Sequence, residues 1–148
     1  MITIQTYSEK DNVKEELRDG IVQFLFEHLE QYGDPKTEIA DAVNYSLGNH
    51  NKPGGTIVTA TDQNNQKLVG AVVVNKTGMG GYIPENILVY IATDKNVRGQ
   101  GIGRRLMQNA INISEGDIAL HCEPDNPAMH LYRKLGFTNK YLEMRLKK

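Results

Sequence analysis

The stretch that decides the fold is Val97-Arg98-Gly99-Gln100-Gly101-Ile102-Gly103-Arg104. It follows an apolar, β-branched run that ends at Thr93, and it precedes apolar residues that recur with the period of a helix. Glycine allows a backbone to approach a ligand closely, and the free N–H groups at the start of a helix attract an anion. Arg98 and Arg104 add positive charge on either side. A strand, a glycine loop and a helix in this order indicate a phosphate-binding site.

Two other phosphate-binding motifs have to be separated from this one. The Walker loop requires lysine and then serine or threonine after its last glycine, whereas Arg104-Arg105 follows Gly103 here. The dinucleotide fingerprint G-x-G-x-x-G opens a parallel sheet, whereas G-x-G-x-G begins at Gly99, well into the second half of this chain. The Walker loop is therefore excluded and the dinucleotide site is disfavoured. A glycine turn that only caps a helix remains as the alternative without a ligand.

Hydrophobic periodicity predicts the elements around the glycine loop. Residues 2–7 alternate as a half-buried strand does, and apolar residues recur every four positions between 12 and 32, as in an amphipathic helix. Gly33-Asp34-Pro35 ends that helix, and a second one follows to about residue 47. The other predicted elements are a hairpin (56–60 and 67–74), a central strand (86–93), a helix from 102, a strand (118–122), a helix (127–135) and a closing strand (141–146). This order predicts an α/β fold with a mixed sheet flanked by helices.

Length and composition narrow the class of protein. A chain of 148 residues suits one domain, 1–148. The formal net charge of −1, without a basic block, disfavours a nucleic-acid partner. Cys122 is the single cysteine, which excludes an internal disulfide and favours a reducing compartment. We see no signal peptide and no membrane span, so we expect a soluble, cytoplasmic protein without a membrane partner.

Two motifs carry a resemblance to a known family. The segment Arg98-Gly99-Gln100-Gly101-Ile102-Gly103 resembles the R/Q-x-x-G-x-G/A signature of the GNAT N-acetyltransferase superfamily. Downstream, Tyr132-Arg133-Lys134-Leu135-Gly136-Phe137 resembles its second hallmark, Y-x-K-x-G-F, in the family's order. The pair is more specific than either motif alone. The resemblance implies a mostly antiparallel sheet of about six to seven strands, about four helices and a central, splayed pair of parallel strands.

The resemblance also implies the donor, acetyl-CoA, and the residues that bind it. In such enzymes the end of the strand before the loop pairs with the pantetheine arm, the loop amides hold the pyrophosphate, and the thioester lies in the gap beside the next strand. The positions that correspond are Ile91, Ala92, Thr93, Arg98, Gly99, Gln100, Gly101, Ile102, Gly103, Arg104 and Asn126.

The same resemblance suggests an acid and a base. Tyr132 matches the tyrosine that similar enzymes place beside the CoA sulfur as general acid, with packing against neighbouring apolar residues as the alternative. Glu85 precedes the central strand, where related enzymes often carry a glutamate that acts directly or through water. The alternative for Glu85 is an ordinary solvated carboxylate. Glu123, at the end of the next strand, is the substitute.

The chain departs from the family pattern at two places. Family members often have asparagine seven residues before the tyrosine, where this chain has Asp125, with Asn126 one position later. Asn126-Pro127 is also a good helix start, so capping competes with CoA contact as the role of Asn126. Lys95 replaces a proline that is common before the signature.

Other side chains that suggest chemistry are discounted. The four histidines lack the clustered spacing of a zinc site, so no metal is expected. Cys122 is interpreted as a small apolar strand residue and not as an acyl carrier. Carboxylates near the first helix junction either favour a cationic amine or are solvated; these are Glu27, Glu30, Asp34 and Glu38.

The leading prediction is an acetyl-CoA-dependent N-acetyltransferase that moves the acetyl group to a primary amine of a small molecule or a protein, by direct attack in a ternary complex. A non-catalytic CoA-binding sensor or partner-binding module is the alternative, and a nucleotide-binding fold of another type is the third. The acceptor is set by segments that vary freely around a common donor site, and no residue there names it. An apolar edge strand near the C-terminus allows a homodimer.

Overall fold

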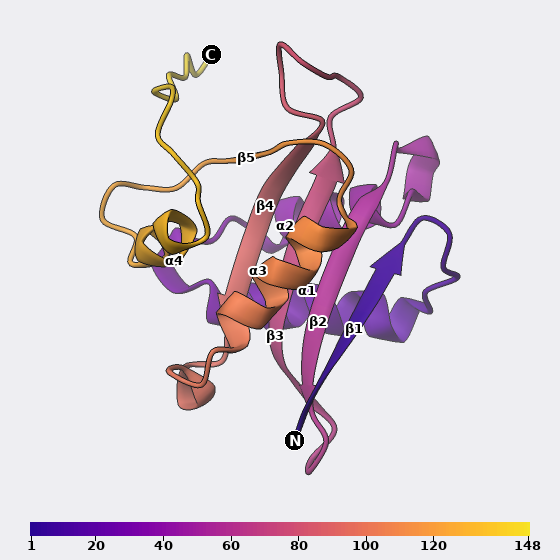
Figure 1. Cartoon of the computed structure of the whole chain (residues 1–148). Coiled ribbons are helices and arrows are strands. Elements are labelled where there is room, and N and C mark those ends of the chain that lie inside the picture. Colours follow the sequence, from indigo (N-terminus) through magenta and orange to yellow (C-terminus); the bar gives the residue numbers. More distant parts are fainter.

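The β-branched runs of the sequence form a five-stranded sheet in the computed structural model, which describes residues 1–148 (Figure 1). The strands are β1 (Ile2–Ser8), β2 (Gly55–Asp62), β3 (Lys67–Lys76), β4 (Asn86–Thr93) and β5 (Ile118–Leu120), and the helices are α1 (Glu15–His28), α2 (Lys36–Ser46), α3 (Ile102–Ile113) and α4 (Ala128–Lys134). The strands lie in chain order. Neighbours from β1 to β4 are antiparallel, and β5 runs parallel to β4. The predicted mixed, mostly antiparallel sheet with four helices is therefore confirmed.

The number of strands was predicted wrongly. The sheet has five strands where six to seven were expected, and the closing strand at residues 141–146 does not form. The strand predicted to end at Cys122 already ends at Leu120. Alternating apolar residues favour an extended backbone, but a strand exists only where another strand accepts its hydrogen bonds, and none does so here.

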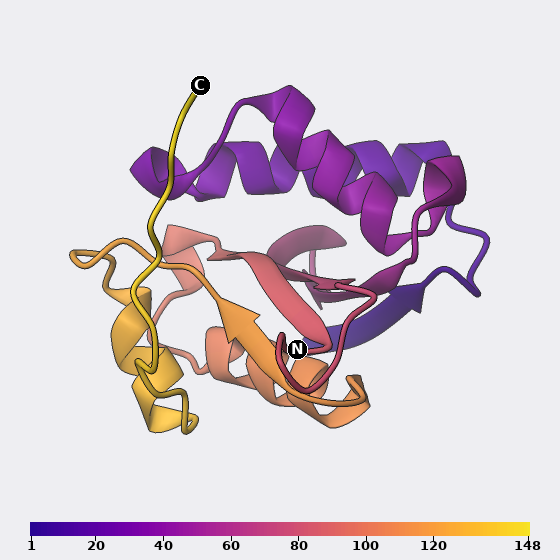
Figure 2. The same cartoon turned by 90° about the horizontal axis from the view of Figure 1, so that it is seen from above.

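Helices cover both faces of the sheet. Figure 2 shows α1 and α2 on one side and α3 with α4 on the other. The first layer buries Ile21, Leu25, Ile39 and Val43 against the sheet. The second buries Ile102, Leu106, Met107 and Ala110, whose spacing places them on one face of α3, as the sequence predicted. Each fully buried aliphatic side chain contributes roughly 1.5–3 kcal/mol to folding.

The predicted helix over residues 12–32 is divided. Helix α1 ends at His28, and a separate 3-10 turn spans Glu30–Tyr32. The break falls at Glu30, whose φ of +56° lies in the left-handed region. Gly20 lies inside α1 without interrupting it. We call residues 29–35, between α1 and α2, the α1–α2 connector. None of the helices is both long and apolar enough to cross a membrane.

Strands β4 and β5 separate part of the way along. Their pairing covers Asn86 to Ile118, Ile87 to Ala119 and Leu88 to Leu120, and then stops. Strand β4 continues to Thr93, which still pairs with Gly70 on β3. Val89 is an extra residue in the β3–β4 ladder, because Val73 pairs with Tyr90 while Val74 pairs with Leu88. From Val89 onward, β4 therefore presents an open backbone edge toward the gap.

Candidate functional site

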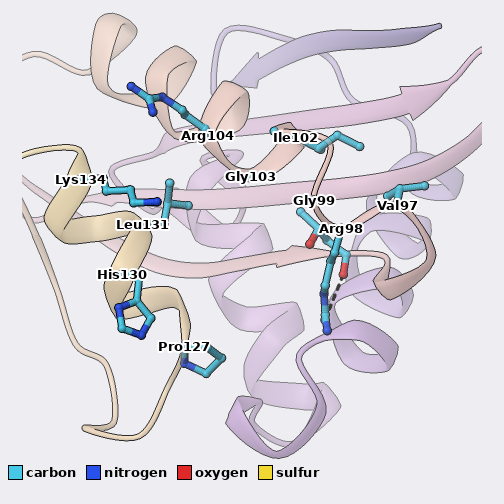
Figure 3. A pocket seen from close by; sticks show the side chains of 12 residues that line it. Val97, Arg98, Gly99, Ile102, Gly103, Arg104, Pro127, His130, Leu131 and Lys134 are labelled. Carbon is cyan, nitrogen blue, oxygen red and sulfur yellow. Dashed lines mark hydrogen bonds between the residues drawn. The ribbon is translucent and has the colours of Figure 1, made fainter.

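A pocket of about 430 Å³ lies where β4 ends (Figure 3). The glycine loop forms one wall and α4 forms the other. The lining residues are Thr93, Val97, Arg98, Gly99, Gly101, Ile102, Gly103, Arg104, Pro127, His130, Leu131 and Lys134. The strand end and the loop that the sequence singled out therefore meet at one cavity.

The loop has this shape because of a turn and two glycines. The Asp94 carboxylate accepts a hydrogen bond of 2.9 Å from the Asn96 N–H, which holds the turn after β4. Gly99 and Gly101 have φ of +83° and +76°, which favours glycine. A Cβ atom at either position would meet no atom within 4 Å. The glycines are thus required by backbone conformation, and the space beside them is open to a ligand.

The pocket is built to attract an anion. Helix α3 begins at Ile102 after Gly101, and no side chain caps its first turn. The first N–H groups of a helix lack intrahelical partners and carry the positive end of its dipole. Arg98, Arg104 and Lys134 line the same cavity, and no carboxylate does. The free amides, the cations and the open glycines fit a pyrophosphate group.

Arg98 already has two partners within the chain. Its Nη2 donates to Glu30 Oε1 at 3.3 Å and to the Thr93 carbonyl at 3.4 Å. Both members of the Arg98–Glu30 pair are about half exposed, at 48% and 47%. Exposed pairs contribute only about 0–1 kcal/mol, so an anionic ligand competes easily with Glu30 for Arg98.

Tyr132 lies on α4, next to the sheet. Its side chain is buried in the core beneath α3, and its ring centroid is 5.8 Å from that of Phe137. Burial, with the nearby Cys122, raises the pKa of Tyr132 to about 12. The phenol is therefore protonated at neutral pH, as a proton donor must be. The packing predicted as the alternative role is present, and the catalytic role stays a prediction.

Glu85 stands at the other end of β4. Its Oε1 accepts a hydrogen bond of 3.0 Å from the Asp117 N–H, just before β5. That N–H lowers the pKa of Glu85. Glu85 precedes the paired part of the two strands and lies about 10 Å along β4 from the point of separation. The base role of Glu85 stays a prediction.

The remaining predicted positions are placed as follows. Ile91 and Ala92 continue the open edge of β4 outside the pocket wall, and the exposed Gln100 does not line it. Asn126 Oδ1 accepts a hydrogen bond of 2.9 Å from the Ala128 N–H, so this side chain holds the turn that leads into α4, although the residue directly before the helix is Pro127. Contact of Asn126 with CoA stays a prediction.

The structure contains no group of three or more His, Cys, Asp or Glu side chains that could hold a metal ion.

A comparison with protein families decides the family. The model of the Acetyltransferase (GNAT) family matches residues 17–137, which is most of the chain. The chain belongs to the GNAT acetyltransferase family. The resemblance inferred from the two motifs is thereby confirmed, and the protein is classed as an acetyltransferase. GNAT enzymes use acetyl-CoA, which agrees with the anion-binding pocket.

Individual relatives of this GNAT chain are distant. N-alpha-acetyltransferase 30 of Schizosaccharomyces pombe is 32% identical over 78 residues, covering 49% of this chain and 52% of the relative. The match thus spans about half the length of that curated relative. A GNAT-family acetyltransferase of Streptococcus pneumoniae TIGR4 superposes with a TM-score of 0.70 at 18% identity, covering 100% of this chain and 98% of the other. A ribosomal-protein-alanine N-acetyltransferase of Brucella melitensis gives a TM-score of 0.65 at 13% identity, covering 100% of both chains. These structures support the fold.

Four pocket residues of this GNAT chain were missed by sequence reasoning. They are Pro127, His130, Leu131 and Lys134. These four belong to or adjoin α4, and Pro127 and Lys134 each lie three or four residues from both His130 and Leu131, as side chains on one helix face do. The signal was therefore present in the sequence, but only the tertiary structure shows which partner this face meets.

Three contacts attach the α1–α2 connector to the walls of the gap. Glu30 pairs with Arg98 of the glycine loop, and the Tyr32 hydroxyl donates to the Asp125 carbonyl at 3.2 Å. The Tyr90 hydroxyl on β4 donates to Asp34 Oδ2 at 2.5 Å. Burial and this carboxylate raise the pKa of Tyr90. Glu30 and Asp34 thus have defined partners and are not merely solvated.

Proposed function

We propose that this GNAT chain transfers an acetyl group from acetyl-CoA to a primary amine of a small molecule or a peptide, by direct attack in a ternary complex. One observation carries the proposal. The cationic, glycine-lined pocket lies at the end of the same β4 edge that opens where β5 separates from it. A ligand with a pyrophosphate and an extended, amide-containing arm matches this sequence of surfaces.

The donor would bind along two neighbouring surfaces. The amides of residues 98–104, with Arg98, Arg104 and Lys134, would hold the pyrophosphate. The open backbone of Ile91, Ala92 and Thr93 would pair with the pantetheine amides as an added strand does. Acetyl-CoA supplies an activated acyl group, because its thioester has a good leaving group.

The transfer requires two proton movements. The neutral amine attacks the thioester carbonyl, a C–N bond forms, and the C–S bond breaks with its electron pair on sulfur. Tyr132, which is protonated at neutral pH, would give its proton to the departing thiolate. Glu85 would take the proton from the amine, directly or through water, and Glu123 is the substitute.

Two observations bear on the class of acceptor. The partial similarity to N-alpha-acetyltransferase 30 makes the amino group of a peptide the first acceptor to test. The exposed Asp34 carboxylate, which accepts a hydrogen bond from Tyr90 on β4, would supply a negative charge that suits a cationic acceptor.

Calorimetric titration with CoA, followed by an assay of thiol release, tests the proposal. We expect saturable CoA binding and acetyl-CoA-dependent thiol release with at least one amine in a panel of peptides and small molecules. Absence of CoA binding would contradict the donor site.

The second candidate function is a CoA-binding module without turnover. It is favoured by one observation: the Glu85 carboxylate is engaged by the Asp117 amide and lies at the paired end of β4. Saturable CoA binding without thiol release across the whole amine panel would support this function over the enzyme.

A further inference from the structure

A second cavity lies beside α2, on the face of the sheet that α1 and α2 cover (Figure 2). Its volume is about 400 Å³, which is in the range of small-molecule sites. It shares no residue with the donor pocket. We call it the α2 pocket. Polar side chains from three segments line it: Asp41, Asn44 and Tyr45 of α2, His50 and Lys52 of the following loop, and Asn75 near the end of β3.

Asn75 supplies a buried hydrogen-bond donor to the α2 pocket. Its side chain lies between α2 and the sheet, and the residue is only 8% exposed. The Ser46 hydroxyl, which is shared with the Val74 carbonyl, donates to Asn75 Oδ1. The Asn75 Nδ2 group donates to no acceptor in the chain, although Asn75 lines the cavity. A buried polar group without a partner is unfavourable, so an acceptor atom of a ligand would compensate for it.

Asn44 repeats this arrangement. Asn49 Nδ2 donates to Asn44 Oδ1 at 2.9 Å, and the Asn44 Nδ2 group makes no hydrogen bond within the chain. Asn44 and Asn75 therefore both have their amide oxygens occupied and their amide nitrogens free at the same cavity. Two free N–H₂ groups favour a ligand oxygen, such as that of a carboxylate.

The other end of the chemistry is an acceptor pair on α2. The Tyr45 hydroxyl gives its proton to the Lys76 carbonyl at 2.6 Å, so its oxygen can only accept a further hydrogen bond. Asp41 precedes Tyr45 by four residues and therefore lies on the same face of α2. A carboxylate beside a hydroxyl oxygen of this kind suits an ammonium group.

The charges of the α2 pocket are free to act on a ligand. Asp41 and Lys52 line the same cavity, yet they do not pair with each other or with any other charged side chain. Lys52 adds a positive charge that suits a carboxylate, and Asp41 adds the negative charge. A ligand that carries both charges would satisfy both residues.

The loop after α2 has the backbone of a constrained site. His50 and Asn51 have φ of +57° and +59°, in the left-handed region that residues other than glycine seldom adopt. Such conformations persist only where the surrounding structure imposes them, and they gather at ligand-binding segments. In this conformation the loop brings His50 and Lys52 to the cavity.

We propose that the α2 pocket binds a free α-amino acid. Its carboxylate accepts hydrogen bonds from Asn44 and Asn75 and faces Lys52, and its ammonium group donates to Asp41 and Tyr45. A free α-amino acid carries these two groups on one carbon, as the neighbouring donor and acceptor sets require. This inference does not depend on the proposed acetyl transfer, because the donor pocket is separate.

Nuclear magnetic resonance of the ¹⁵N-labelled protein tests the proposal directly, because it observes side-chain amides. We expect at least one of the common L-amino acids, added one at a time, to shift the Asn44 and Asn75 N–H₂ signals in a saturable manner. The signals of residues 98–104 should stay in place. The amide of the same amino acid, and its analogue without the amino group, should bind about tenfold more weakly. No response to any amino acid, shifts centred on residues 98–104, or equal binding of the amide would overturn the proposal.

Two exposed positions separate the charges by mutation. Lys52→Gln and Asp41→Asn should each raise the Kd of the amino acid about tenfold, with the dispersion of the spectrum unchanged. Lys67→Gln is the matched control, because this exposed lysine begins β3 outside the cavity and should leave the Kd unchanged. Asp41→Asn should not weaken binding of the analogue without the amino group. Equal effects of Lys52→Gln and Lys67→Gln, or equal losses of both ligands in Asp41→Asn, would contradict the assignment.

Discussion

At the scale of single residues, the surroundings shift the pKa values of the two proposed catalytic groups in opposite directions. Burial keeps the Tyr132 phenol protonated, with a pKa raised to about 12. A backbone N–H keeps the Glu85 carboxylate ionised, with a lowered pKa. At neutral pH the phenol carries its proton and the carboxylate does not, as the two proposed roles require, but each shift moves the pKa away from neutrality and weakens the group as an acid or a base.

Replacing Tyr132 by phenylalanine tests the acid. Tyr132→Phe keeps the ring that packs against Phe137 and removes the proton that the leaving thiolate needs. We expect kcat to fall by about 10²–10⁴-fold, with CoA affinity nearly unchanged. Steady-state kinetics and calorimetry measure the two quantities. Equal losses in both would assign Tyr132 to packing alone.

Replacing Glu85 by glutamine tests the base. We expect Glu85→Gln to lower kcat by about 10²-fold or more without a change in CoA affinity, because Glu85 lies far from the pocket. Since its pKa is lowered from 4.5, the acid limb of kcat/KM that Glu85 causes should lie below that pH and vanish in the variant. An unchanged kcat would mean that Glu85 only accepts the hydrogen bond from the Asp117 N–H and is not the base. Glu123→Gln would then test Glu123 in that role.

At the scale of elements, the donor site is a junction of β4, the glycine loop, α3 and α4. The loop supplies amides because its glycines adopt conformations that other residues adopt only with strain. Helix α3 supplies a dipole, and α4 supplies Lys134 from across the cavity. The connector between α1 and α2 then attaches to this junction through Arg98.

A side chain at Gly101 should block the donor. Gly101→Val adds bulk on the open side of a residue with φ of +76°, so it should abolish CoA binding and destabilise the fold by about 1–2 kcal/mol. Gly103→Ala is the control. A Cβ there meets Leu131 Cδ2 at an ordinary 3.5 Å, so this variant should fold and bind CoA. Calorimetry and thermal unfolding report both effects, and undiminished CoA affinity in Gly101→Val would refute the loop assignment.

Freeing Arg98 should strengthen donor binding. Glu30→Gln removes the carboxylate that competes with a pyrophosphate for Arg98, and an exposed pair of this kind corresponds to at most about fivefold in affinity. We expect the Kd for CoA to fall by a few-fold, while the Kd for pantetheine, which has no phosphate, stays constant. Glu27→Gln is the control, because Glu27 lies near the end of α1, close to Glu30 in the chain, but does not pair with Arg98. Weaker CoA binding in Glu30→Gln would mean that Glu30 positions Arg98 instead of competing for it.

At the scale of the whole molecule, the sheet separates two hydrophobic cores, of which one lies beneath the donor site. Leu106, on α3, belongs to the core beneath the donor site, whereas Leu25, on α1, belongs to the core on the opposite face. Both side chains are fully buried. The start of α3, with its free amides, packs on the first of these cores, because Ile102 belongs to it.

A matched pair of core variants tests this division. Leu106→Ala and Leu25→Ala should each lower the free energy of unfolding by about 2–5 kcal/mol. CoA affinity should fall in Leu106→Ala, because α3 then packs less tightly against the sheet. It should be unchanged in Leu25→Ala. Denaturant unfolding and calorimetry on the folded variants measure the two effects. Equal CoA affinity in both variants would contradict the division.

Local chemistry made the donor loop predictable. The signal consists of glycines at alternate positions, with a strand before them and a helix after them. All of these features lie close together in the chain, so they predict an anion-binding loop without knowledge of the remaining fold. The period of Ile102, Leu106 and Ala110 was interpreted correctly for the same reason. Family resemblance then added the mostly antiparallel sheet with one parallel pair of strands, and the catalytic role of Tyr132 stays a prediction.

The sequence by itself therefore determined the helix at the glycine loop, the mixed sheet and the family, because these depend on local spacing and on two motifs. Only the tertiary structure decided that α4 completes the pocket, that Glu30 holds Arg98, and that Glu85 faces Asp117. It also decided that residues 141–146 remain without a partner despite their strand-like pattern. The physical reason is the same in each case: a contact between distant segments depends on which surfaces the fold brings together, and periodicity describes only the face that a segment offers.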